Sequence, residues 1–326
     1  MHTLNIVVWG IGPHAIKNIL PAIKDNKNLN LYGILSRNFS VVTQIAKEYN
    51  CISFSNEDEM LTDANIHIVY VATPTGLHYS QGIKIIESNK HFWSEKPIVQ
   101  NSAQAYSLIE LANKKKLTIA EGFMYLYHPA FDFLKSSLKL NELGNLNNIT
   151  LDFGLPKLSR PGFRNNIKLG GGSIYDLGTY AISAVIELFE NEKIEVIYCE
   201  IKYDTNSNVD TSAFVLLKIN NSINVILRWA YNVAYKNEIN IWGDEGTLLS
   251  KHFFSKPVNY CSEFIITNMN GFSRIENIKP SNQFCNMFNV FFDNIYNESQ
   301  SKRHQEIVVK RSNLLDKLLL ININRL

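Results

Sequence analysis

The sequence predicts an α/β chain with two domains, a doubly wound one over residues 1–121 and an α+β one with an open, mainly antiparallel sheet over residues 122–326. Three observations lead to this prediction. The first third alternates short apolar runs with amphipathic stretches, which is the pattern of a parallel sheet covered by helices on both faces. Strand-like runs dominate the rest, and tight polar turns join several of them. A chain of 326 residues also exceeds the size that one hydrophobic core usually serves.

Five apolar runs are expected to form the first sheet, and four segments with apolar residues every three or four positions are expected to form helices between them. The strands are Asn5–Trp9, Leu29–Leu35, Ile66–Ala72, His91–Trp93 and Leu117–Ala120, and the helices are Ala15–Lys24, Ser40–Tyr49, His78–Ser88 and Ala103–Lys114. Because strand and helix alternate, each strand can be reached through a crossover helix, as the doubly wound fold requires.

After Gly122 the pattern changes to one helix that follows Pro129 and then to a series of strands. The expected strands are Leu146–Phe153, Val196–Tyr203, Ala213–Ile219, Ile223–Trp229 and Glu238–Trp242. Polar turns at residues 220–222 and 243–246 predict antiparallel hairpins. Helical patterns at 282–296 and 314–323 end the chain and could pack on either domain.

The composition excludes several classes of protein. A formal net charge of +2 gives no electrostatic preference for nucleic acid or an anionic membrane. No apolar stretch approaches the roughly 18 residues of a membrane-spanning helix, and the opening run Leu4–Trp9 is too short for a signal peptide. The four cysteines are far apart and form no Cys-x-x-Cys pair, which argues against a zinc or dithiol site. We expect a soluble, cytoplasmic protein that binds no nucleic acid, no membrane and no metal.

A glycine turn lies between the first expected strand and helix, and consists of Gly10, Ile11, Gly12, Pro13, His14 and Ala15. Glycines at such a turn let the backbone approach a pyrophosphate at the helix N-terminus. A small alanine suits the close packing of helix and strand, and a proline is tolerated in the first turn because its missing N–H has no intrahelical partner. An ordinary tight turn is the alternative. The position at the start of a βαβ pattern favours a dinucleotide site in a Rossmann domain.

Ser36 and Arg37 follow the second expected strand, where an NAD enzyme usually places an acid against the adenosine ribose. A hydroxyl followed by a guanidinium instead suits a 2′-phosphate, since arginine offers bidentate donors and no acid repels the anion. NADP(H) is therefore favoured over NAD(H). The alternative is that Arg37 is a solvated loop residue that stacks on adenine without discriminating between the two.

Three segments carry candidate substrate groups. Lys96 lies between Glu95 and Pro97 after a predicted parallel strand, where it could hydrogen-bond a substrate oxygen and help to shuttle a proton. Most lysines are solvated surface residues, and the position after a strand raises the weight of this one. Arg164, after Phe163, could offer a cation to a sugar or diphosphate, or could pair with a carboxylate of its own domain.

A triple glycine at 170–172 leads into the third segment, a predicted helix on which Asp176 and Tyr180 share one face. A carboxylate beside a phenol could fix a sugar hydroxyl and pass a proton to a carbonyl oxygen. Ser173 and Asp176 also match a capping box, in which the acid only closes the first helical turn. The alternative for Tyr180 is an amphipathic position whose hydroxyl bonds a neighbour or water.

Together these segments resemble the glucose-fructose oxidoreductase and inositol dehydrogenase family over nearly the whole chain. The matching segments are Gly10–Ala15, Val71–Pro74 with His78, Glu95–Pro97, Glu121–Tyr125 running to His128 and Pro129, and Gly170–Tyr180. The resemblance implies that Thr73, Pro74 and His78 border the cofactor, that Glu95 and Lys96 lie near the nicotinamide, and that Tyr125, Asp176 and Tyr180 face the substrate.

The resemblance also implies a branch of the family. Inositol dehydrogenases tend to have histidine in place of Tyr180, whereas several sugar and nucleotide-sugar members have tyrosine, and segment 228–254 resembles members that act on nucleotide-linked keto sugars. Leu126 departs from the polar or basic residue of many relatives. We expect reversible hydride transfer between NADP(H) and a hydroxyl or keto carbon of a sugar. Lys96 and Tyr180 would handle the proton, and Asp176 would orient the substrate.

Two other functions remain as alternatives, an NAD-dependent polyol or inositol dehydrogenase and a non-enzymatic NAD(P)-sensing regulator. Joint retention of Lys96, Asp176 and Tyr180 favours chemistry over sensing. Relatives with an open antiparallel sheet often pair through its exposed face, so a homodimer or homotetramer is expected.

Overall fold

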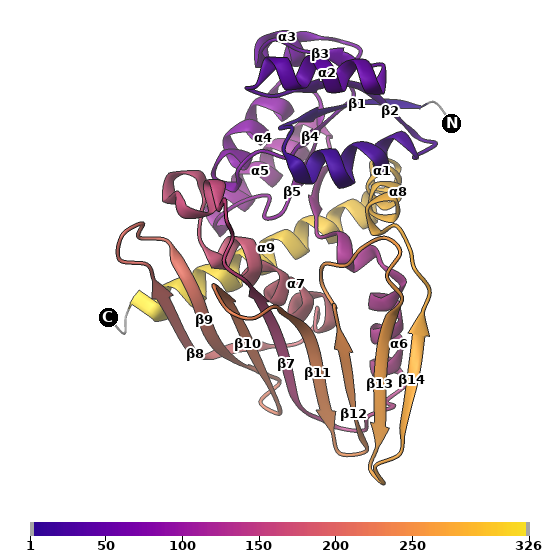
Figure 1. Cartoon of the computed structure of the whole chain (residues 1–326), viewed down its shortest axis with the longest axis vertical. Helices are drawn as coiled ribbons and strands as arrows, with labels where there is room; N and C mark the ends of the chain where they lie inside the picture. The colour runs from indigo at the N-terminus through magenta and orange to yellow at the C-terminus, as the bar shows by residue number, and fades with distance from the viewer. Residues whose placement is uncertain (1–2, 324–326) are drawn as a thin grey trace. The chain divides into compact units, whose positions relative to one another are not determined.

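The computed structural model describes residues 3–323, which divide into two compact units (Figure 1). Unit one contains the described residues up to Gly122 together with Phe284–Ser312, and unit two contains Phe123–Gln283 and the described residues from Asn313. This division differs from the predicted boundary, which assigned the entire chain after residue 121 to the second domain. The reason is aromatic packing by helix α8 (Gln283–Tyr296), whose Phe288 ring lies 5.3 Å from that of Tyr70.

Unit one contains a six-stranded parallel sheet in the order β3-β2-β1-β4-β5-β6, which confirms the doubly wound prediction. The order reverses between β1 and β4, and ligands of such sheets bind at that switch point. The two-residue strand β3 is too short to leave a sequence pattern. The strands are β1 (Leu4–Trp9), β2 (Leu29–Leu35), β3 (Ile52–Ser53), β4 (Ile68–Val71), β5 (His91–Glu95) and β6 (Ile119–Gly122).

Helices cover both faces of this sheet (Figure 1). Apolar residues of α4 and α5 pack with Val69 and Phe92 on one face, while the alternating Tyr70 and Trp93 contact α8 on the other. Four predicted helices are confirmed, and the six-residue α3 was missed. The helices are η1 (Ala15–Ile19), α1 (Leu20–Lys24), α2 (Phe39–Tyr49), α3 (Glu57–Thr62), η2 (Thr75–Leu77), α4 (His78–Glu87) and α5 (Ser102–Lys115).

Unit two contains an eight-stranded sheet in the order β14-β13-β12-β11-β7-β10-β9-β8, antiparallel except for the pair β7 and β10. The turns at 220–222 and 243–246 join β9 to β10 and β11 to β12 as the predicted hairpins. The predicted hairpin at 243–246 implied β12 without giving its bounds, and β13 and β14 were not predicted. The strands are β7 (Leu146–Leu155), β8 (Ile194–Tyr203), β9 (Asp210–Ile219), β10 (Ile223–Tyr231), β11 (Lys236–Gly243), β12 (Gly246–Lys251), β13 (Ser262–Asn268) and β14 (Ser273–Ile278).

Helices α6 (Pro129–Lys139) and α7 (Thr179–Leu188) cover one face of the second sheet (Figure 1). The ring centroid of Phe133 on α6 lies 4.8 Å from that of Phe264 on β13. A Cβ on Gly178, which immediately precedes α7, would come within 2.7 Å of Trp229 on β10. Short turns η3 (Met124–Tyr127), η4 (Gly162–Asn165), η5 (Ile167–Leu169) and η6 (Ile174–Gly178) precede the two helices.

Helix α9 (Glu298–Ile323) ends the described chain and has residues in both units. It begins 16 residues before the predicted start at Leu314, because its first half is rich in charged and polar residues and carries no clear apolar period. Over residues 3–323, no helix combines the length and apolar character needed to cross a membrane.

Candidate active site

The glycine turn lies at the switch point of the first sheet. Gly10 has φ +108°, and a Cβ there would approach the carbonyl carbon of Ala72 within 2.6 Å, so only glycine lets the ends of β1 and β4 come together. A Cβ on Gly12 would meet no heavy atom within 4 Å. Open space at the N-terminus of a helix suits a pyrophosphate, so these residues fit a bound dinucleotide. The π-helical turn η1 follows, and such turns are frequent at functional sites.

Glu95 ties this turn to the end of β5. Its Oε1 lies 3.0 Å from Nε2 of His14 and accepts a hydrogen bond of 2.7 Å from the hydroxyl of Tyr70. Burial would raise the pKa of Glu95, but His14, Tyr70 and the nearby Lys96 outweigh burial and lower it. Glu95 is therefore a carboxylate at neutral pH and holds the exposed His14 beside the glycines.

The end of β2 presents the predicted selectivity residues. Ser36 is half-buried and Arg37 is exposed, while Asn38 caps α2 by accepting the N–H of Val41 at 3.4 Å. The turn therefore offers a hydroxyl and a guanidinium, and it contains no acid that would repel a phosphate.

The loop after β4 holds Thr73 and Pro74 half-buried, with the hydroxyl of Thr73 donating to Oε1 of Gln81 at 2.6 Å. His78 lies beneath this loop and is 1% exposed. Its Nε2 is 2.8 Å from the carbonyl oxygen of Thr73, and its Nδ1 is 2.9 Å from that of Pro97. Burial lowers the pKa of His78, although its hydrogen bonds to the two carbonyls would raise it. His78 therefore contacts the backbone carbonyls of the loop after β4 and of the turn after β5.

In unit two, Asp176 is bound from two sides. Nε of Arg164 donates to its Oδ2 at 2.6 Å, and the hydroxyl of Tyr231 donates to the same oxygen at 3.0 Å. The cation of Arg164 therefore pairs with a carboxylate of its own unit. Burial and Asp176 raise the pKa of Tyr231, which stays protonated.

The capping-box interpretation is wrong. Ser173 does not cap the helix with its side chain; its hydroxyl donates to Oδ2 of Asp210 at 2.5 Å, and the N–H of Ile174 donates to the same oxygen at 2.6 Å. A carboxylate from β9 thus takes the place of the cap. No local motif signals this role, because Asp210 lies 37 positions from Ser173.

Tyr180 is 8% exposed within an aromatic cluster. The centroid of its ring lies 5.7 Å from that of Phe123, 5.3 Å from that of Phe153 and 5.6 Å from that of Phe254. Its hydroxyl contacts Sδ of Met124 at 3.5 Å. Asp176 lies in the π-helical turn η6, where it contacts Arg164 and Tyr231, and Tyr180 follows in α7. The shared substrate role of this carboxylate and phenol stays a prediction.

Tyr125 belongs to the same aromatic cluster. Its hydroxyl is 2.7 Å from Oγ of Ser183 and 3.2 Å from the carbonyl oxygen of Tyr180. Burial raises the pKa of Tyr125 well above its ordinary value. These contacts fix Tyr125 against helix α7, and the substrate contact that the resemblance implies stays a prediction.

Comparison with known sequences gives matches along most of the chain. The profile of the oxidoreductase family with an NAD-binding Rossmann fold (GFO_IDH_MocA) matches residues 4–123, and the profile of the GFO/IDH/MocA C-terminal domain matches residues 131–249. A relative from Saccharopolyspora spinosa, dTDP-3,4-didehydro-2,6-dideoxy-alpha-D-glucose 3-reductase, is 27% identical over 257 residues, which cover 79% of this chain and 77% of the relative.

Solved structures share the fold. KijD10, a 3-ketoreductase from Actinomadura kijaniata solved in complex with NADP and TDP-benzene, superposes with a TM-score of 0.94 at 21% identity over 98% of both chains. Aldose-aldose oxidoreductase from Caulobacter crescentus, solved with glycerol, superposes with a TM-score of 0.89 at 19% identity over 100% of this chain and 99% of that chain.

Proposed function

This chain belongs to the GFO/IDH/MocA oxidoreductase family, and from that premise we propose that it reduces a keto carbon of a nucleotide-linked sugar with NADPH, reversibly. The glycine turn at the switch point carries the cofactor part of the proposal, because it offers an open helix N-terminus beside the strand end that bears Lys96. The relatives that are 3-reductases of a dTDP-linked keto sugar support the substrate class.

The reaction needs a hydride, a proton and a group that orients the sugar. Bound NADPH would supply a hydride to the carbonyl carbon and leave as NADP⁺. Lys96 and Tyr180 would together deliver the proton that the carbonyl oxygen gains, and Asp176, held by Arg164 and Tyr231, would orient the sugar. KijD10 has been solved with a lysine and with a tyrosine replaced at positions 84 apart, the separation of Lys96 and Tyr180 here, which supports this pair.

The direct test is turnover. Purified protein with NADPH and dTDP-3,4-didehydro-2,6-dideoxy-α-D-glucose, the substrate named for the relatives, should consume NADPH and yield the hydroxy sugar. Turnover of myo-inositol with NAD⁺ instead would establish the polyol dehydrogenase alternative. Tight NADPH binding without turnover of either class would favour the regulator.

Arg37 supplies the cofactor prediction. Arg37→Ala should weaken NADPH binding about 10- to 150-fold, the equivalent of one charged hydrogen bond of roughly 1.5–3 kcal/mol, and should leave NADH binding nearly unchanged. Fluorescence titration of both cofactors measures this. Lys47→Ala removes another exposed cation from the same unit and serves as the control. Equal losses for the two cofactors would contradict a contact with the 2′-phosphate.

The open face of the second sheet supports a proposal that the protein is a homodimer or a dimer of dimers. Phe214 is 39% exposed on this face, and beside it lies a groove of about 470 Å³ in which Asp152 pairs with Arg228 and Lys236. Phe214→Glu should shift the dimer toward monomer by placing a charge in the covered surface. Light scattering at micromolar concentration measures the mass, and an unmodified protein that is monomeric there would remove the proposal.

A cytoplasmic location also belongs to the proposal. Its support is the cysteine usage, since Cys51, Cys199, Cys261 and Cys285 are all free thiols. Fractionation of the source cells with an antibody would test it.

A further inference from the structure

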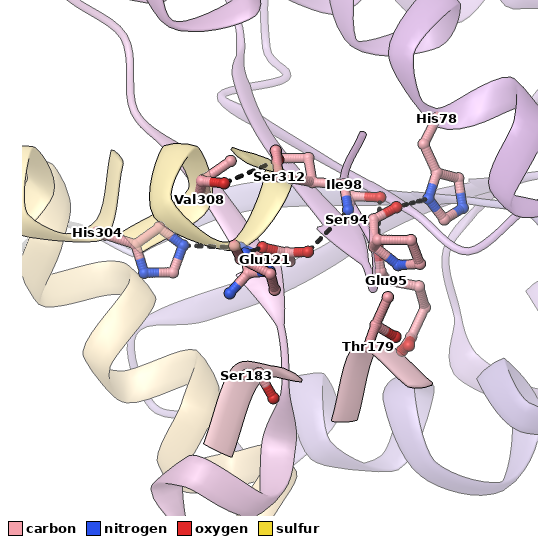
Figure 2. Close-up of polar contacts among 12 residues, drawn as sticks. His78, Ser94, Glu95, Ile98, Glu121, Thr179, Ser183, His304, Val308 and Ser312 are labelled. Carbon is pink, nitrogen blue, oxygen red and sulfur yellow. Dashed lines mark hydrogen bonds and ion pairs between the residues drawn. The ribbon is translucent and has the colours of Figure 1, made fainter. Parts of the chain in front are cut away.

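The turn that carries Lys96 is held on both sides by buried polar side chains of unit one (Figure 2). On one side, the carbonyl oxygen of Pro97 lies 2.9 Å from His78, which also contacts the carbonyl of Thr73. On the other side, the N–H of Ile98 donates to Oε1 of Glu121 at 3.0 Å. The backbone is thus fixed immediately after Lys96.

Glu121 is itself fixed by helix α9. It is 2% exposed, and its Oε2 forms an ion pair with Arg311, which is 4% exposed. Burial lowers the pKa of Arg311 to about 9, so the guanidinium is still charged at neutral pH. The N–H of Glu121 donates to Nε2 of His304 at 3.0 Å. Burial and then Arg303 lower the pKa of His304 to about 4, so its ring is neutral and can accept this bond.

Stability alone gives little reason to bury this ion pair. Two buried ions lose their hydration, and well-packed apolar residues of similar size are often at least as stabilising. Apolar residues could not, however, accept the N–H of Ile98, and a buried amide without an acceptor is unfavourable. The carboxylate of Glu121 therefore does something that an apolar residue cannot do: it sets the position of the backbone two residues after Lys96.

We propose that Glu121 is a positioning residue for Lys96, acting through the backbone of Ile98, and that Arg311 neutralises the buried charge of its carboxylate. The proposal rests on the function proposed for Lys96.

Two matched double variants test it. Glu121→Gln with Arg311→Met removes both charges and keeps an oxygen that can accept from Ile98, whereas Glu121→Met with Arg311→Met removes the acceptor and keeps the side-chain length. The first should retain kcat within about threefold, and the second should lose roughly 100-fold, because small displacements of a reacting group cost about that much. The Kd of NADPH and the KM of the dTDP-linked keto sugar should change little in either variant.

Hydrogen exchange gives a readout that needs no substrate. The amide of Ile98 should remain protected in the glutamine variant and exchange faster in the methionine variant, with NADPH present in both. Equal exchange at Ile98 together with equal kcat in the two variants would overturn the proposal. If the native protein has no turnover with the sugar probe, the proposed function fails, while exchange at Ile98 still decides whether Glu121 holds the turn.

A third variant covers poor folding of the double variants. Glu121→Asp keeps the charge opposite Arg311 and shortens the side chain by one methylene, so it should fold, expose the Ile98 amide to exchange and lower kcat. Full kcat with an unprotected Ile98 amide would show that this contact does not position Lys96.

Discussion

Lys96→Met should lower kcat about 10²–10⁴-fold, the range that a positioned acid–base group contributes. Methionine keeps most of the length and apolar volume of the lysine but has no ammonium to donate a proton or bind the substrate oxygen. The half-buried position of Lys96 after β5, beside the ionised Glu95, makes loss of charge the main change. Steady-state kinetics with NADPH and the dTDP-linked keto sugar measure the effect.

A matched control separates this effect from the loss of any lysine in unit one. Lys84 on α4 is half-exposed and pairs with Glu57, and exposed pairs of this kind contribute little to stability. Lys84→Met should therefore keep both kcat and NADPH affinity. If Lys96→Met keeps kcat as well, the proton comes from another group. Glu121 would then have no catalytic lysine to position.

The Rossmann part of the fold was predictable because its signals are local. Each strand from β1 to β6, except β3, is an apolar run flanked by segments with helical periodicity. Gly10 must be glycine because the backbones at the ends of β1 and β4 pack closely, and the glycine motif already predicts this close packing. Helix α8 was predicted as a helix but not as part of unit one. Its place depends on Phe288 meeting Tyr70, a contact between residues far apart in the chain.

The second half of the candidate site was less predictable, again because its contacts are remote. Asp176 matched a local capping box, but the cap comes from Asp210 on β9, and Asp176 is taken by Arg164 and Tyr231. Local spacing predicts only the contacts that a single helix can make. The π-helical turn η6 changes even those contacts, since its i→i+5 hydrogen bonds alter which side chains share a face.

Tyr180→Phe provides the sharpest separation of chemistry from packing. The phenyl ring keeps the aromatic contacts with Phe123, Phe153 and Phe254. The substitution removes only the hydroxyl, which contacts the thioether of Met124, a weak hydrogen-bond acceptor, and it keeps the ring that fills the cluster. The melting temperature and the Kd of NADPH should therefore stay close to those of the native protein.

Turnover of Tyr180→Phe should nevertheless fall about 10²–10⁴-fold if the phenol passes the proton to the carbonyl oxygen. The reason is that the variant lacks only the phenolic hydroxyl, which is the acid–base group, while the ring that positions this hydroxyl is kept. A structural role predicts the opposite result, an altered melting temperature with kcat retained by the folded protein. Thermal melts and kinetics on the same preparation distinguish the two. Full kcat in this variant would assign the proton to Lys96 or a bound water, and Tyr180 would then be a core residue of the second unit.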